Sequence, residues 1–239
     1  MRRFLTLVSR EYRDARWNLV MAFGMATLAP WVVHAVFLEV APDETTALVG
    51  GRLLVPLLFA LFAAATASDL VARDVATRRI DALAALPVSV SELWRAKAAF
   101  LLVSSLAFLA WTIGMEYAAV TATARAESIA LLSERLADAV PTLLGGVAFG
   151  AATLFFSTLL ERGFTAVMAA LVTVTALAWG VQVAEVPAAD DATTWFATYA
   201  VPLGIALAFG AGSYAAFVRG PIHGPSKARL FATGAVAVF

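Results

Sequence analysis

Apolar residues dominate this chain in six long stretches that are separated by shorter polar segments. An α-helix rises about 1.5 Å per residue, so roughly 20 apolar residues cross the roughly 30 Å hydrocarbon core of a bilayer. The sequence therefore predicts six membrane-spanning helices, at Leu19–Leu38, Leu53–Ser68, Ala98–Met115, Ala139–Leu160, Phe164–Ala184 and Trp195–Val218. The second stretch has only 16 residues. We expect its helix to extend past Gly50, or Arg52 to snorkel toward the interface.

The segment before the first span, residues 1–18, has an amphipathic pattern. Apolar residues recur at helical spacing at Phe4, Val8, Tyr12, Ala15 and Leu19, and arginines occupy much of the opposite face. This pattern is typical of a helix that lies flat on the cytoplasmic leaflet. Such a helix either only anchors the first span or also contacts a cytoplasmic partner.

The segment between the second and third spans, residues 69–97, is too long for a simple turn. Its pattern predicts two helices that are divided at Pro87. Ser89 and Glu92 have the S-x-x-E spacing of a capping box, which satisfies free amide groups at a helix start. The second helix would continue through Lys97 into the third span. The segment is either an ordinary interfacial loop or a rigid lever that moves the ends of two spans.

The end of the chain, residues 219–239, is predicted to be a cytoplasmic tail. Its apolar run Leu230–Phe239 has ten residues and cannot span a bilayer alone. This run either lies at the interface or begins a seventh span of a longer protein. The sequence thus divides into an interfacial helix (1–18), a six-helix membrane domain (19–218) and this tail.

Composition supports an all-α integral membrane protein. The chain has 239 residues, of which 62% are hydrophobic and 14% are charged, whereas soluble domains have about 25% charged residues. The chain has no cysteine and two histidines, which excludes disulfide frameworks, thiolate metal sites and cysteine nucleophiles and leaves little basis for a histidine metal site. The formal net charge is zero, so nothing indicates a nucleic-acid-binding protein.

The distribution of positive charge predicts the orientation of the chain. With the N-terminus in the cytoplasm, 14 of the 17 Lys and Arg residues lie on the cytoplasmic side. Only Arg52, Arg125 and Arg135 lie on the other side, so the positive-inside rule places both termini in the cytoplasm. A cleavable signal peptide is disfavoured because its apolar region is about 7–15 residues long, and here about 20 apolar residues follow a polar helix.

One segment resembles a known family. Residues 74–97 are similar to the cytoplasmic loop of ABC-2 type transporter permeases, which contains acidic positions, leucines, Pro-Val-Ser, Glu-Leu and a lysine. The matching residues are Asp74, Asp81, Leu83, Leu86, Pro87, Val88, Ser89, Glu92, Leu93 and Lys97. The chain differs at Arg78 and Arg79, where the family usually has Gly-Thr, and at Ala96, which is usually Gly.

The resemblance implies a transport function. In this family the loop docks on a separate ABC ATPase subunit, which binds ATP and Mg²⁺, and the permease works as a homodimer or heterodimer in the bacterial inner membrane. It implies that the coupling residues here are Asp74, Arg78, Arg79, Asp81, Leu83, Leu86, Pro87, Ser89, Glu92 and Lys97. Haem-exporter membrane subunits share this plan and are a related alternative. The chain itself has no Walker A motif, so we expect a transport subunit, not an enzyme, that binds no cofactor or metal.

Few ionisable groups occur inside the predicted spans. Glu116 follows 18 uncharged residues of the third span, which favours a hydrated boundary residue over a substrate or proton site. We expect His34 to form a hydrogen bond to a neighbouring helix rather than to bind a ligand. Gly146 and Gly150 form a GxxxG pattern, which permits close helix approach inside the bundle or at a dimer interface.

A second function class stays open at this point. The chain could be a membrane assembly factor or a sensor without transport activity, and residues 1–18 and 69–97 would then bind a cytoplasmic partner without ATP. The presence of a co-purifying ABC ATPase would separate the two interpretations. The substrate is not indicated, because no predicted span carries a charged cluster.

Overall fold

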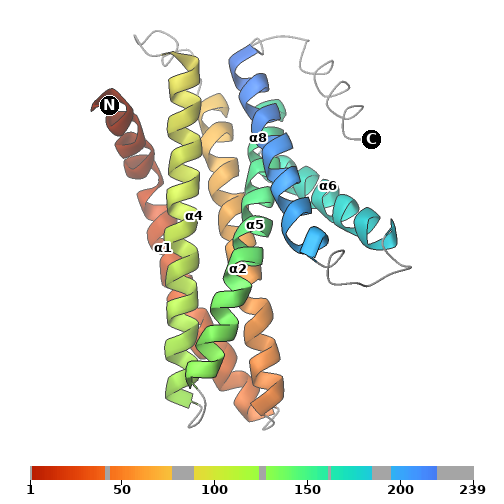
Figure 1. The fold of residues 1–239 in the computed structure, drawn as a ribbon. Coiled ribbons are helices and arrows are strands. Elements are labelled where there is room, and N and C mark those ends of the chain that lie inside the picture. Colours follow the sequence, from red (N-terminus) through yellow and green to blue (C-terminus); the bar gives the residue numbers. More distant parts are fainter. Residues whose placement is uncertain are drawn as a thin grey trace.

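A computed structural model describes residues 2–40, 44–76, 89–123, 128–160, 163–184 and 195–219, and its regular structure there is entirely helical (Figure 1). The elements are α1 (Arg2–Val40), α2 (Glu44–Ala76), α4 (Val90–Thr123), α5 (Ser128–Leu159), α6 (Gly163–Ala184), the π-helical turn η1 (Phe196–Ala200) and α8 (Val201–Arg219). The predicted all-α class is confirmed for this part of the chain. The second predicted span does extend past Gly50, because α2 begins at Glu44.

Four helices are long and apolar enough to cross a membrane, judged over the described residues. These segments are Leu54–Val71, Val90–Ala119, Ala137–Leu159 and Phe196–Val218. A shorter apolar stretch, Gly163–Leu177, lies in α6. The chain is therefore a membrane protein by this criterion, whereas the six-span prediction is supported for four spans only. The other two predicted spans, in α1 and α6, are helical but do not meet the criterion.

The helices form one bundle in which α1, α2, α4 and α5 run lengthwise and α6 and α8 are inclined against them (Figure 1). Helix α5 contacts α2, α6 and α8, while α1 contacts α2 and α4. Large apolar side chains also cover the outer surface, among them Met21, Val172 and Leu207 on three different helices, each about two thirds exposed. Such a surface suits contact with lipid rather than with water.

One end of the bundle gathers the parts that flank the predicted cytoplasmic segments. The first part of α1, the end of α2, the start of α4 and the end of α8 all lie at this end, which is uppermost in Figure 1. We call it the upper end. Among its basic residues whose side chains are described are Arg10, Arg13, Arg16, Arg95 and Lys97. The sidedness of the membrane itself stays a prediction.

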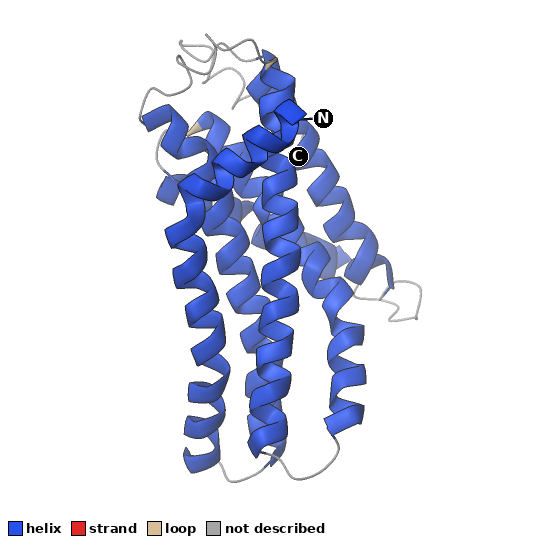
Figure 2. Ribbon diagram, turned by 90° about the vertical axis from the view of Figure 1, so that its left-hand side faces the viewer, coloured by secondary structure: helices blue, strands red, loops and turns tan. Residues whose placement is uncertain are grey.

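Residues 1–18 and the first predicted span belong to one continuous helix, α1, from Arg2 onward. Figure 2 shows its first part inclined to the remainder. The buried face of this part consists of Leu7, Glu11 and Ala15, spaced four residues apart. Tyr12, predicted on the apolar face, lies outside this buried face and is exposed. The interfacial position of this part stays a prediction.

Helix α5 approaches α2 closely at the predicted GxxxG pattern. A Cβ atom on Gly146 would overlap the Phe59 ring, and one on Gly150 would lie 3.5 Å from the Ala63 Cβ. Phe59 and Ala63 are one turn apart on α2 and both are buried. The two glycines thus serve packing inside the bundle, one of the two roles left open by the sequence.

Candidate functional site

A buried ionic cluster joins α1, α2 and α4 at the upper end. Lys97 of α4 is 1% exposed, and its Nζ donates hydrogen bonds to the Leu70 carbonyl oxygen at 2.6 Å and to Glu11 Oε1 at 3.2 Å. Nζ also lies 2.7 Å from Asp74 Oδ2, in an ion pair whose angle is outside hydrogen-bond geometry. At this separation the Coulombic attraction is strong whatever the angle. A single ammonium therefore binds three helices together.

The charges of the cluster balance. Glu11 and Asp74 are both buried, and Arg10 lies beside them with its guanidinium 3.8 Å from Asp74 Oδ1. Arg10 also lies 3.9 Å from the Asp14 carboxylate, one turn along α1. Removing one partner from a buried ion pair leaves an uncompensated charge and costs about 3–5 kcal/mol. A variant that removes one member of the cluster should therefore be destabilised.

Apolar packing surrounds these charges. The buried neighbours are Leu7 and Ala15 from α1, Leu70 and Val71 from α2, Leu93, Ala96 and Phe100 from α4, and Phe217 from α8. Burial raises the pKa of Glu11 above its usual 4.5, and the Lys97 ammonium partly opposes this shift. Folding therefore favours the protonated form of Glu11, and in that form Lys97 keeps its ion pair with Asp74.

The start of α4 is built as the sequence predicts. The Ser89 N–H donates to Glu92 Oε2 at 3.1 Å, and the Glu92 N–H donates to Ser89 Oγ at 3.2 Å. This reciprocal pair is the predicted capping box, which is confirmed. The helix then continues without interruption from Val90 past Lys97 into the predicted third span.

A second contact fixes the same turn of α4 to α8. Trp94 Nε1 donates a hydrogen bond to Ser213 Oγ at 3.1 Å, and its ring meets Tyr214 edge to face with centroids 5.2 Å apart. Ser213 is fully buried. The first two turns of α4 are thus linked to α1 and α2 through Lys97 and to α8 through Trp94.

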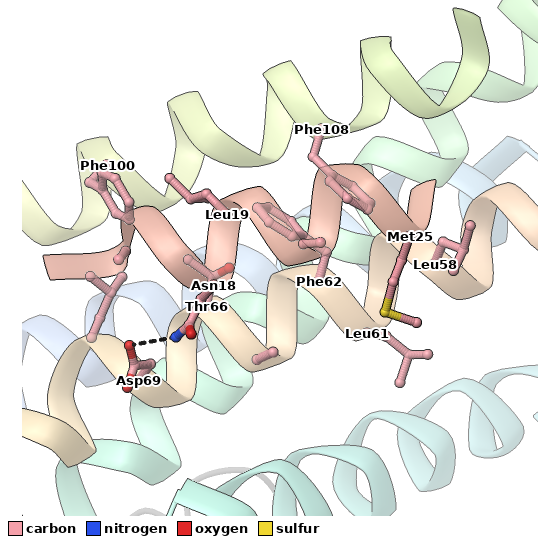
Figure 3. A pocket seen from close by; sticks show the side chains of 14 residues that line it. Asn18, Leu19, Met25, Leu58, Leu61, Phe62, Thr66, Asp69, Phe100 and Phe108 are labelled. Atoms are coloured by element: carbon pink, nitrogen blue, oxygen red, sulfur yellow. Dashed lines mark hydrogen bonds between the residues drawn. The ribbon is translucent and has the colours of Figure 1, made fainter. Parts of the chain in front are cut away.

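Below the cluster lies a groove between α1 and α2, with α4 behind it (Figure 3). Its volume is about 240 Å³, and Leu70, whose carbonyl oxygen binds Lys97, is one of its lining residues. At its polar end Asn18 Nδ2 donates to Asp69 Oδ2 at 3.2 Å. Sites for drug-sized ligands have about 300–1,000 Å³. In this conformation the groove is therefore too small for a solute of that size.

The predicted coupling residues fall into three groups. Arg78, Arg79, Asp81, Leu83, Leu86 and Pro87 lie outside the described residues. Ser89 and Glu92 are exposed at the start of α4. Asp74 and Lys97 are buried and paired with each other, so in this conformation their side chains cannot meet a docking partner.

The intramembrane candidates have mixed outcomes. Glu116 was expected to be a hydrated boundary residue, and this expectation is wrong, because the side chain is 1% exposed. Phe108, Thr112 and Ala119 share its helical face and are also buried, so the period of α4 turns Glu116 toward the bundle. His34 lies in α1, and its side chain is outside the described part of the structure.

Glu11 is the residue that sequence reasoning missed. It is acidic, but it lies one turn from Leu7 and one turn from Ala15, both buried. A lone carboxylate on an otherwise apolar stripe was the available signal. Its partner Lys97 is 86 residues away in the sequence, which no local pattern could connect.

No family model, no curated protein and no solved structure matches this chain.

Proposed function

We propose that this chain is the membrane-spanning permease subunit of an ABC-2 type transporter that exports an unidentified substrate. It would have six spans with both termini in the cytoplasm and would reside in a bacterial inner membrane. A second copy or a related permease would complete the membrane part. Two separate ATPase subunits would bind ATP and Mg²⁺ and supply the energy.

The observation that carries this proposal is the position of the ionic cluster. Helices α2 and α4 flank the predicted coupling residues, and Lys97 joins the last turns of α2 to the first turns of α4 and to α1. A force applied between α2 and α4 would therefore reach three helices together. A coupling element needs such a rigid connection, because a loop that moved alone would transmit nothing to the spans.

Docking is tested by affinity purification from native membranes in mild detergent, with mass spectrometry of the co-purifying proteins. We expect a stoichiometric ABC ATPase with the wild-type chain and its loss from the double variant Arg79→Glu, Asp81→Arg. Asp138→Arg is the matched control, because Asp138 is exposed in the first half of α5, a helix that begins at the end of the bundle opposite the upper end (Figure 1). Asp74 is left unchanged, since its substitution would disturb the buried cluster.

Each outcome has a definite meaning. Recovery of the intact wild-type chain without an ATPase would favour the assembly-factor or sensor interpretation. An ATPase retained by the double variant would refute the assignment of the docking surface while leaving the permease proposal standing.

The predicted orientation has its own test, because the chain contains no cysteine. Single-cysteine variants Arg95→Cys and Asp138→Cys place one exposed thiol in the first two turns of α4, which begins at the upper end, and one in the first half of α5, which begins at the opposite end (Figure 1). We expect a membrane-impermeant maleimide to label position 138 in right-side-out vesicles and position 95 in inverted vesicles. The reverse pattern would overturn the cytoplasmic placement of the N-terminus.

A further inference from the structure

A second groove, between α1 and α4, has a volume of about 670 Å³. Leu19 and Phe100 line both grooves, but Arg16 and Val20 line only this one and Asn18 lines only the α1–α2 groove. Its volume falls in the range of about 300–1,000 Å³ that small-ligand sites have. Along α1 the lining begins with the apolar Leu5 and Val8, continues with the polar Ser9, Tyr12 and Arg16, and is apolar again from Leu19 to Phe23.

The polar part of this groove carries hydrogen-bond donors and one positive charge. Ser9, Tyr12 and Arg16 line it, and each is exposed. The Arg16 guanidinium lies 5.6 Å from the Trp17 ring centre, and among the described residues Arg16 makes no ion pair. The charge is therefore available to an anion, and an exposed Trp beside an Arg is typical of a membrane interface.

The apolar part continues from there along both helices. Val20 and Phe23 line it on α1, and Val103 and Ala107 line it on α4. Val20 is 58% exposed and Val103 is 64% exposed, so the groove is open toward the surroundings of the bundle. From Arg16 to Phe23 the helix advances about 10 Å, at about 1.5 Å per residue. The groove thus offers an apolar surface one helix segment long next to a cationic side chain.

The α1–α2 groove provides a contrast on the same helix. Its polar end holds the Asp69 carboxylate, which accepts a hydrogen bond from Asn18. A carboxylate at that end repels an anion, whereas Arg16 in the α1–α4 groove attracts one. The two sides of α1 therefore differ in charge preference.

We propose that the α1–α4 groove binds one anionic phospholipid of the surrounding bilayer. The phosphate lies at Arg16 and Tyr12, and an acyl chain lies along Val20, Phe23 and Val103. A phospholipid satisfies both parts of the groove, since a soluble anion would leave the apolar part uncovered. This site is additional to the proposed transport function and does not depend on it.

Binding is measured by native mass spectrometry of the purified chain in detergent. The probes are phosphatidylglycerol and phosphatidylcholine with the same acyl chains. We expect phosphatidylglycerol to bind more tightly to the wild-type chain. Arg16→Gln should weaken the binding of phosphatidylglycerol about fivefold to tenfold, because one basic side chain near an anionic lipid contributes about that factor to the affinity. Arg95→Gln is the control, since Arg95 is exposed at the same end but does not line the groove.

The apolar part of the α1–α4 groove is tested by a substitution that fills it with a larger side chain. Val103→Trp should weaken the binding of both lipids. Leu61→Trp places the same side chain at an exposed position of the α1–α2 groove and should leave the binding of both lipids unchanged. Equal losses from Arg16→Gln and Arg95→Gln would overturn the proposal in favour of general charge attraction. Equal effects of the two tryptophan variants, or displacement of the lipid by glycerol 3-phosphate, would also overturn it.

Discussion

The contact between Gly146 of α5 and Phe59 of α2 allows a quantitative prediction with an internal control. In the variant Gly146→Ala the new methyl group would overlap the Phe59 ring, which is fully buried. Overpacking of this kind costs about 1–3 kcal/mol. The neighbouring Gly145 has no atom within 4 Å of its would-be Cβ, so Gly145→Ala adds a methyl group in open space.

Comparison of the two variants isolates the clash. Replacing Gly by Ala inside a helix changes the intrinsic helix propensity by about 1 kcal/mol at either position. This contribution cancels in the difference, which leaves Gly146→Ala less stable than Gly145→Ala by about 1–3 kcal/mol. For a chain of this size 1 kcal/mol corresponds to about 2–4 °C in Tm. The expected gap is therefore roughly 2–12 °C.

Thermal unfolding in one detergent, followed by circular dichroism, measures this gap. A third variant, Phe59→Leu with Gly146→Ala, checks the cause, because the smaller side chain makes room for the methyl group and should recover part of the lost Tm. Equal Tm values for Gly145→Ala and Gly146→Ala would show that α2 and α5 do not meet at this glycine, and the helix arrangement would have to be revised.

Three further predictions concern the upper end of the bundle. Lys97→Met strands two buried carboxylates and should lower the free energy of unfolding by about 3–5 kcal/mol in denaturant titration, whereas the exposed Arg95→Met should change it by at most about 0.5 kcal/mol. Folding raises the pKa of Glu11 above 4.5, so the protonated carboxyl group adds to the free energy of unfolding. This stabilisation is complete below pH 4.5 and is lost as pH rises through the higher folded-state pKa. Stability measured against pH should fall less steeply above pH 4.5 in Glu11→Gln, and identical slopes would contradict this. Ser213→Ala should cost about 1–2 kcal/mol in the wild-type background and less in Trp94→Phe, as a double-mutant cycle would show; equal costs would mean that the hydrogen bond does not form.

Local features of the chain were predictable because they depend on residues close in sequence. The length of an apolar run predicts whether a spanning helix is present, and all six predicted spans lie in helices. The capping box of Ser89 and Glu92 needs only a three-residue spacing and the backbone of one turn. The continuity of α1 was harder to predict, because a polar segment and an apolar segment have different patterns although no helix-breaking residue separates them.

Rotation of each helix about its axis was the least predictable property. Tyr12 and Glu11 are neighbours, yet Glu11 is buried and Tyr12 is exposed. Glu116 is also turned inward, although its place near the end of an apolar run favoured contact with water. A difference of one residue rotates a side chain by about 100° around the helix, so a small error in the assumed face reverses a burial assignment.

The sequence alone determined that this chain is helical and apolar enough for a membrane, and it located a helix start at Ser89. Tertiary structure alone decided that Lys97 meets Glu11 and Asp74, and that α1 borders one groove lined by the acidic Asp69 and another lined by the basic Arg16. The physical reason is the separation in sequence over which each interaction acts. Hydropathy and capping act over a few residues, whereas an ion pair between residues 86 positions apart exists only after three helices have packed in one rotation and register.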